Sequence, residues 1–249
     1  MATAPDDPGY PLGAASAPDL AALAGRLVQC RACPRLVAWR EAAAANPRAA
    51  FRGQVYWARP VPGFGDDAAR IAVVGLAPAA DGANRTGRMF TGDRSGDFLF
   101  AALHRVGLAN QPTATGLDDG LELTGVRLVA PVRCAPPANK PTPDERRRCG
   151  PWLARELELL APTVRVVLAL GAIGWDAALR TLEEQGWHVP RPRPKFAHAA
   201  AIPLGRPGGG QVVLMGSFHP SPHNTFTGRL TPEMLDAVLT RAKELGGLV

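Results

Sequence analysis

Four short runs of apolar residues recur along the chain, and none of them alternates regularly with polar residues. They cover residues 70–76 (RIAVVGL), 126–132 (VRLVAPV), 164–170 (VRVVLAL) and 212–216 (VVLMG). Short apolar runs of this kind predict strands that are buried on both faces, as in a parallel sheet.

Between these runs, apolar residues recur at helical spacing. Thr142-Pro-Asp-Glu145 has a capping Thr, a Pro in the first helical position and a Glu in the third, which is the signature of a helix start. A similar Thr-Pro-Glu begins at Thr231, and Gly171 opens a helix directly after a strand. The predicted helices cover residues 95–108, 142–160, 171–185 and 231–245.

This alternation of strands and helices predicts an α/β fold with a parallel sheet covered on both faces. In such sheets, ligands bind beyond the carboxyl ends of the strands. Residues 185–210, rich in Pro, Arg and Gly, predict an exposed and partly irregular connection.

The chain of 249 residues is expected to form one domain over residues 19–249, because α/β folds commonly reach this size undivided. Residues 1–18, rich in Ala, Pro, Gly and Asp, predict a disordered tail. No run of about 18 apolar residues appears, which argues against a membrane span. The N-terminus also lacks the basic and apolar regions of a signal peptide. The expected location is therefore the cytoplasm, with no membrane partner.

The net charge of +6 fits a polyanionic partner such as nucleic acid. Many basic proteins bind no polyanion, however, so the charge alone leaves both possibilities open.

The four cysteines have a spacing that suggests a metal site. Cys30 and Cys33 are separated by two residues, which lets both thiolates face one metal centre. Cys134 and Cys149 follow a hundred residues later. In a cytoplasmic chain disulfides are a poor default. The spacing therefore allows a zinc site with four thiolate ligands, an iron–sulfur cluster or four unrelated buried thiols.

Three polar loops follow predicted strands, at residues 75–94, 133–142 and 217–229. The first is dense in Gly and Ala, so that a ligand can approach its backbone closely. It contains neither the phosphate loop G-x-x-x-x-G-K-[ST] nor the dinucleotide motif G-x-G-x-x-G, so a nucleotide cofactor is not expected. The third contains the stiff stretch FHPSPHN, which is either a catalytic edge or only a tight turn.

Three motifs together carry a resemblance to a known family: GLAPAADGANRTGRMFTGD, RCAPPANKPTP and FHPSPHN. With the four cysteines in this order, they resemble the family 5 uracil-DNA glycosylases, the iron–sulfur-containing branch of broad specificity. The resemblance covers roughly residues 25–245. It implies a three-layer α/β/α sandwich with a short central parallel sheet. It also implies a structural [4Fe–4S] cluster on Cys30, Cys33, Cys134 and Cys149, which leaves zinc as the minor alternative.

The implied reaction is the hydrolysis of the N-glycosidic bond of a deaminated base that has been flipped out of DNA. Asp81 is expected to position water and to offset the positive charge of the sugar. His219 is expected to donate to the departing base, and Asn139 to support the positioning of water or base. Phe90 is expected to stack on the base. Leu76, Ala77 and Ala130 are expected to line the base pocket.

The expected partner is DNA that contains uracil or another deaminated base, bound by a monomer near the bacterial nucleoid. The side chains expected to contact this DNA are Ser221, His223, Asn224, Arg229, Arg85, Arg88 and Lys140.

Two departures from the related family 4 enzymes bear on the mechanism and on the substrate range. Leu76 stands where those enzymes carry a Glu, and Asp81 is expected to take over the role of that Glu. Ala130 stands where they carry an Asn that reads uracil. Losing an amide that binds one base weakens discrimination against others. We therefore expect hypoxanthine, xanthine and some modified pyrimidines to be excised as well as uracil.

Two other functions agree less well with these residues. A non-catalytic iron–sulfur or zinc protein that binds nucleic acid would keep the cysteines but lose Asp81 and His219, which this chain retains. A zinc hydrolase needs an open metal position for its catalytic water, and four thiolates leave none.

Overall fold

The computed structural model describes residues 4–248. Its six-stranded sheet has the order β1-β3-β2-β4-β6-β5. The inner four strands are parallel to one another, and the two edge strands are antiparallel to their neighbours. The strands are β1 (Phe64–Gly65), β2 (Ile71–Val74), β3 (Val126–Val129), β4 (Val166–Leu170), β5 (Ala201–Gly205) and β6 (Gln211–Ser217).

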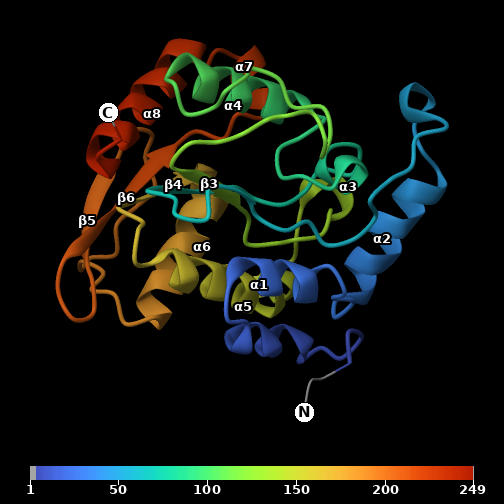
Figure 1. The fold of residues 1–249 in the computed structure, drawn as a ribbon, viewed down its shortest axis with the longest axis horizontal. Helices are drawn as coiled ribbons and strands as arrows, with labels where there is room; N and C mark the ends of the chain where they lie inside the picture. The colour runs from blue at the N-terminus through green and yellow to red at the C-terminus, as the bar shows by residue number, and fades with distance from the viewer. Residues whose placement is uncertain (1–3, 249) are drawn as a thin grey trace.

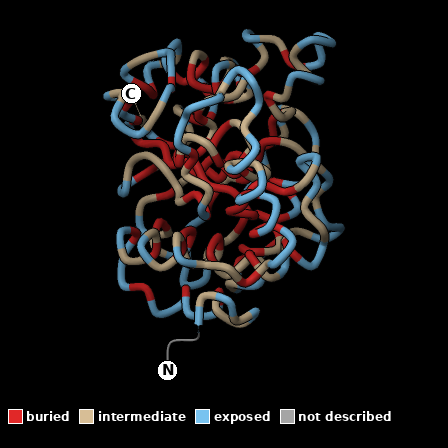
Figure 2. The backbone as a smooth tube through the Cα atoms, turned by 90° about the vertical axis from the view of Figure 1, so that its right-hand side faces the viewer, coloured by how far each residue is buried: buried red, intermediate tan, exposed pale blue. Residues whose placement is uncertain are grey.

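Helices cover both faces of this sheet, with α4 and α8 on one face and α5 and α6 on the other (Figure 1). The backbone of the sheet is buried between them (Figure 2). The α-helices are α1 (Leu20–Leu27), α2 (Pro34–Ala45), α3 (Ala83–Thr86), α4 (Arg94–Arg105), α5 (Pro143–Leu160), α6 (Gly171–Glu184), α7 (Pro222–Phe226) and α8 (Pro232–Gly246). The 3-10 helices are η1 (Tyr10–Ser16), η2 (Ala49–Phe51) and η3 (Pro137–Asn139). The three-layer α/β/α sandwich with a central parallel sheet is thus confirmed.

The predicted helix starts are borne out by their capping bonds. The Thr142 hydroxyl accepts from the Glu145 backbone N–H, and the Glu145 carboxylate accepts from the Thr142 N–H. The Thr231 hydroxyl accepts from the N–H of Met234 in the same way. Each cap satisfies N–H groups that the first helical turn leaves without partners.

The edge strand β5 lies within residues 185–210, where the sequence predicted an irregular connection. Leu204 is its one buried residue, and the strand includes Pro203, so the apolar run of a buried strand is missing. β5 exists because it pairs with β6, with Ala201 opposite Met215 and Gly205 opposite Gln211. A Pro is tolerated here because an edge strand needs hydrogen bonds on one side only.

The N-terminal segment corrects the prediction that residues 1–18 form a disordered tail. Residues 1–3 lie outside the described part, but Tyr10–Ser16 form η1, which packs against α5. Ala14 and Ala17 are fully buried, and the Arg155 guanidinium donates to the Ala17 carbonyl at 2.6 Å. The composition suggested disorder because small residues bury little apolar surface. Their small side chains, however, allow η1 to pack closely against α5.

Among residues 4–248, none of the helices combines the length and the apolar character that crossing a membrane requires.

Candidate active site

A cavity of about 1230 Å³ lies at the carboxyl edge of the sheet. Its walls come from the loops that follow β2, β3 and β6 and from the start of α6. The parallel register ends all inner strands at this edge, with Val74 opposite Val129 and Leu170 opposite Ser217. The structure therefore brings residues of all three predicted loops around one space.

Asp81 lies in the loop between β2 and α3 and lines this cavity, with its side chain 19% exposed. Both of its carboxylate oxygens have partners. The Tyr56 hydroxyl donates to Oδ1 at 2.9 Å, and the Arg48 Nε lies 2.7 Å from Oδ2. Burial and the adjacent carboxylate raise the pKa of Tyr56 to about 12, so its phenol remains a donor at neutral pH.

Phe90 lines the cavity with a backbone φ of +56°, a conformation unusual for a bulky residue. Two glycines make room for it. A Cβ at Gly75 would lie 2.6 Å from Phe90 Cζ, and a Cβ at Gly96 would lie 1.5 Å from the Phe90 carbonyl oxygen. No other residue fits at either glycine without a shift, so the orientation of Phe90 depends on both.

His219 follows β6, and its ring centroid lies 6.2 Å from that of Phe90. Burial lowers the pKa of His219 to about 4, so the imidazole is neutral at physiological pH and carries one N–H donor. The backbone around it is fixed, because the Asn224 amide donates to the His219 carbonyl at 2.9 Å. Gly171 passes close by, and a Cβ there would lie 3.3 Å from that of His219.

The remaining predicted pocket residues also lie around this cavity. Leu76, Ala77 and the buried Ala130 form part of its wall. Asn139 lines it from the exposed end of η3 and has a φ of +55°. Lys140, the next residue, is exposed, and its carbonyl accepts from Arg35 at 3.2 Å.

The predicted DNA contacts divide into two groups. Ser221, Asn224 and Arg229 line the cavity, and His223 is exposed on α7 beside them. Arg85, in contrast, stabilises the Asp81 loop. Its three guanidinium nitrogens donate to the Asp81 carbonyl, the Gln54 amide oxygen and the Gly92 carbonyl.

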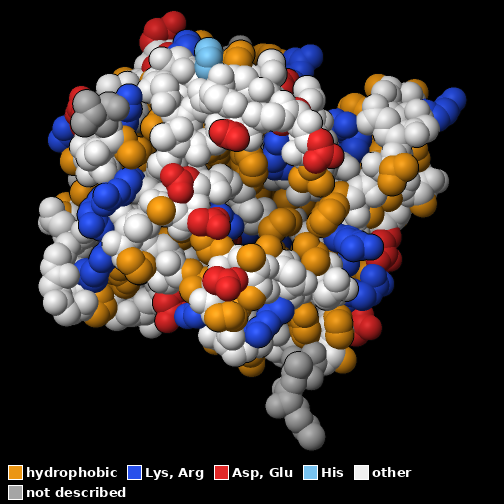
Figure 3. Space-filling view, in the orientation of Figure 1, with side chains coloured by type: hydrophobic (Ala, Val, Ile, Leu, Met, Phe, Trp, Pro, Cys, Tyr) orange, Lys and Arg blue, Asp and Glu red, His pale blue; other side chains and the backbone are white. Residues whose placement is uncertain are grey.

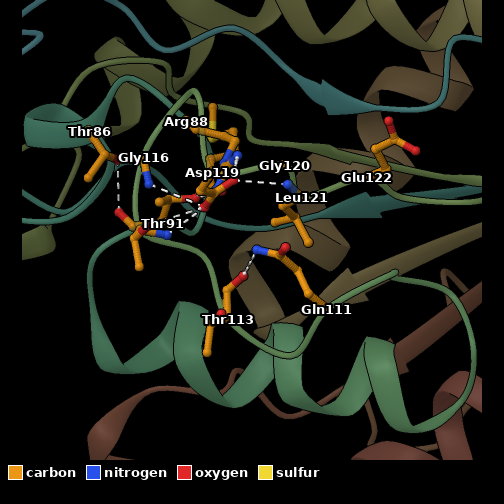
Figure 4. A network of polar contacts seen from close by, with 12 residues as sticks. Thr86, Arg88, Thr91, Gln111, Thr113, Gly116, Asp119, Gly120, Leu121 and Glu122 are labelled. Carbon is orange, nitrogen blue, oxygen red and sulfur yellow. Dashed lines mark hydrogen bonds and ion pairs between the residues drawn. The ribbon is translucent and has the colours of Figure 1, made fainter.

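Arg88 is a correction to the predicted set, because its side chain is only 2% exposed and is paired with Asp119 (Figure 4). Its guanidinium donates through both terminal nitrogens to Asp119, at 2.8 Å for Nη1. Asp119 also accepts from the backbone N–H groups of Thr115 and Leu121. Arg88 and these N–H bonds hold the pKa of Asp119 well below its usual range. Arg88 thus fixes the residues 113–121 loop against the Phe90 loop.

The sequence missed several residues that shape this site. Arg48 and Tyr56 carry no motif, and only the fold brings them to Asp81. Phe226, at the end of α7, is 69% exposed, and the Arg94 guanidinium lies 5.0 Å from its ring centroid. The sequence signal for Phe226 was an aromatic residue in an otherwise polar stretch, two residues beyond the predicted Asn224.

The four cysteines converge from three segments onto a second, small cavity, which Arg133 and Trp152 also line. All four are free thiols. Burial, with the nearby thiols, raises the pKa of Cys33 to about 12, and burial raises that of Cys134 to about 11. These thiols therefore keep their protons unless a bound metal replaces those protons.

The surroundings of these thiols suit an anionic group. The Arg40 guanidinium donates to Cys134 Sγ at 3.0 Å, and within residues 4–248 the buried Arg40 Nε and Arg133 Nη1 have no hydrogen-bond partner. In the same part of the chain, no three potential ligands lie close enough to hold a single metal ion. Four thiols around one small cavity, with a guanidinium donor beside them, fit a metal–sulfur group of negative charge.

The comparison with known proteins decides the family. The model of the uracil DNA glycosylase superfamily matches residues 62–243, which includes every loop of the large cavity that follows a strand. The chain belongs to the uracil-DNA glycosylase superfamily.

Within this superfamily, the chain is similar to the type-5 enzymes over most of its length. It is 54% identical over 230 residues to a type-5 uracil-DNA glycosylase of Thermus thermophilus, which covers 92% of this chain and 100% of the relative. It is 53% identical over 219 residues to one of Mycobacterium tuberculosis, covering 88% of this chain and 79% of the relative. A type-4 enzyme of Archaeoglobus fulgidus is 35% identical over 109 residues, 43% of this chain and 47% of the relative. The family 5 resemblance is thus confirmed.

Proposed function

We propose that this uracil-DNA glycosylase superfamily member flips uracil out of DNA and hydrolyses its N-glycosidic bond in base excision repair. The observation that carries the proposal is the meeting of Asp81, Phe90 and His219 around one cavity at the carboxyl edge of the sheet. The names of the type-5 relatives supply the substrate class, since each is called a uracil-DNA glycosylase. The product is an abasic site in the DNA.

Phe90 and His219 would receive the flipped base. Stacking of a base on an aromatic ring contributes about 1–3 kcal/mol, which helps offset the loss of stacking in the duplex. The neutral His219 would donate its N–H to a base oxygen. This bond strengthens as negative charge builds on the departing base, which is the condition for lowering the barrier.

Asp81 would act on the sugar side of the bond. Cleavage develops positive charge on the sugar, and a carboxylate held by Tyr56 at a fixed position would offset that charge and orient the attacking water. Asn139 would support the water or the base from its own wall of the cavity.

The DNA strand would run over the mouth of the cavity. Ser221, His223, Asn224, Arg229 and Lys140 are the candidates for contacts to phosphates, and exposed Phe226 provides an apolar contact beside them. Only two of these candidates, Arg229 and Lys140, carry a full positive charge, so we expect a moderate dependence of binding on salt. Other Lys and Arg side chains are dispersed over the face of the molecule drawn in Figure 3.

The shape of the cavity favours a wide range of bases. Leu76 and the small Ala130 leave its wall without an amide or carboxylate at these positions, and a volume of about 1230 Å³ has room for a purine. Hypoxanthine, xanthine and some modified pyrimidines are the further proposed substrates.

The proposed cofactor is a [4Fe–4S] cluster held by Cys30, Cys33, Cys134 and Cys149. Support comes from the four thiols around one cavity and from the guanidinium groups of Arg40 and Arg133 beside them. When bound, the cluster would join three segments: residues 30–33, helix α5, and the loop that follows β3. Because Cys134 and Asn139 share a loop, this tie would also position the wall that carries Asn139.

Release of free uracil tests the proposal directly. The purified protein should convert a uracil-containing duplex to an abasic-site duplex, while a thymine-containing duplex of the same sequence stays intact. Binding of both duplexes without any base release would instead support the non-catalytic DNA-binding alternative. The chain is proposed to act as a monomer in the bacterial cytoplasm. Size-exclusion chromatography of the protein with the duplex would test the oligomeric state.

A further inference from the structure

The two partners of Asp81 differ sharply in exposure. Tyr56 is buried and holds Oδ1, whereas the Arg48 side chain that holds Oδ2 is 79% exposed. Arg48 lies in the connection between α2 and η2 and lines the rim of the cavity. One oxygen of the candidate catalytic carboxylate is therefore held firmly and the other is held by a side chain that can leave.

A cation bound to Oδ2 conflicts with the role proposed for Asp81. The carboxylate must offset positive charge on the sugar, and an adjacent guanidinium cancels part of its own charge. An exposed ion pair is also weak, because water screens it and the long arginine side chain loses freedom on pairing. The pair can thus give way to a stronger competitor.

A DNA strand entering the cavity brings such a competitor. A backbone phosphate accepts two parallel hydrogen bonds from a guanidinium, which Oδ2 alone cannot offer through the single contact seen here. We propose that Arg48 exchanges Asp81 for a DNA phosphate when substrate binds, which frees Oδ2 for the sugar and water while Tyr56 keeps Oδ1. This inference rests on the proposed function and adds Arg48 to the residues that bind the DNA backbone.

Such an exchange makes Asp81 a competitor of DNA for Arg48. Removing the charge of Asp81 should therefore tighten DNA binding, and the gain should depend on Arg48. A simple loss of repulsion between Asp81 and DNA would tighten binding as well, but equally with or without Arg48. A double-mutant cycle separates the two cases.

The cycle uses a duplex with a tetrahydrofuran abasic analogue, which none of the variants can cleave, and reads Kd by fluorescence anisotropy. Asp81→Asn should tighten binding about 5-fold in the wild-type background and less than about 2-fold with Arg48→Ala. Arg48→Ala alone should weaken binding and lower the slope of log Kd against log salt by about one. Arg52→Ala, four residues away and also exposed, is the control and should leave the effect of Asp81→Asn intact.

The inference is overturned if Asp81→Asn tightens binding equally in both backgrounds, or if Arg48→Ala leaves both Kd and the salt slope unchanged. It is also overturned if Arg48→Ala lowers the single-turnover rate at saturating uracil-DNA by tenfold or more, since Arg48 would then act on Asp81 within the reacting complex. Uracil release by the wild type is measured separately. If the wild type releases uracil but Arg48 and Asp81 show no coupling in DNA binding, only the exchange of partners is rejected. If the two residues are coupled but no uracil is released, the proposed function is rejected.

Discussion

The backbone of Gly96 lies directly under Phe90, so closely that a Cβ at Gly96 would come within 1.5 Å of the Phe90 carbonyl oxygen. Phe90 in turn adopts a φ of +56°. A glycine at the first turn of α4 thus fixes an unusual backbone conformation, which aims an aromatic ring into the cavity.

Gly96→Ala is expected to displace Phe90 and to lower kcat/KM on uracil-DNA by about tenfold or more, through loss of base stacking. The control is Gly25→Ala in α1, where an added Cβ meets nothing within 4 Å. That variant should keep full activity and gain about 0.5–1 kcal/mol of stability, because Ala suits a helix better than Gly. Equal activity in the two variants would contradict the role given to Gly96.

Phe90→Ala is expected to lower kcat/KM by about tenfold to a hundredfold, the equivalent of about 1–3 kcal/mol of stacking. Phe90→Leu keeps a large apolar side chain but has no aromatic face, so it should be impaired almost as strongly as Phe90→Ala. A thermal melt of both variants checks that the fold is intact. Near-wild-type activity of Phe90→Leu would contradict a stacking role.

Tyr56→Phe removes one hydrogen bond to Asp81 and keeps the shape of the buried ring. A bond to a charged group contributes about 1.5–3 kcal/mol, so the single-turnover rate should fall roughly tenfold or more. Tyr10→Phe provides the matched control. The Tyr10 hydroxyl donates to the Arg26 carbonyl at 3.0 Å, and neither residue lines the cavity. The rate of that variant should equal the wild-type rate; a similar fall in both would point to general loosening instead.

The depressed pKa of His219 makes a prediction about pH. The group's ordinary value is 6.5, and burial lowers it to about 4, so between these values the unfolded chain binds one proton more than the folded one. The stability due to neutral His219 is therefore full above pH 6.5 and is lost as the pH falls toward 4. Denaturant unfolding at several pH values should show this loss in the wild type and a smaller one in His219→Asn.

Catalysis should follow the same titration. If neutral His219 donates to the base, the single-turnover rates of the wild type and of His219→Asn should depend on pH in the same way near pH 6.5. The contribution of His219 should disappear only toward pH 4. A loss of the wild-type rate with an apparent pKa of 6.5 that His219→Asn abolishes would contradict the environment described for this imidazole.

The proposed cluster predicts iron, acid-labile sulfide and a brown colour in anaerobically purified protein. Cys149→Ala should lose the iron and lower the melting temperature, because α5 would no longer be tied to the segments of Cys30 and Cys134. Cys134→Ala should do the same and should also reduce uracil release through the displaced Asn139 wall. A colourless wild-type protein that contains zinc would contradict the iron–sulfur assignment.

The sequence predicted those features that rest on local chemistry. The buried strands and the capped helices at Thr142 and Thr231 follow from apolar runs and hydrogen-bonding side chains close in sequence. Strand β5 could not be predicted, because its pairing with β6 rather than its own residues makes it a strand.

The candidate site was predictable to the same extent. Asp81, Phe90 and His219 stand in recognisable motifs at strand ends and line one cavity. The sequence predicts a DNA contact for Arg88 because a charge in a polar loop is usually exposed, and only the fold reveals its ion pair with Asp119. Arg48 and Tyr56 reach Asp81 over 33 and 25 residues of chain, and no motif records such long-range contacts.

The most direct test of the central claim is a single-turnover assay of uracil release from duplex DNA. It compares the wild type with Asp81→Ala, Asn139→Ala and His219→Ala. The wild type should release uracil and leave an abasic site. Asp81→Ala and His219→Ala should each be slower by about a hundredfold or more, as expected for groups that stabilise charge in the transition state, and Asn139→Ala should be slower to a smaller degree. A wild type that releases no base, or three variants that match it, would contradict the account.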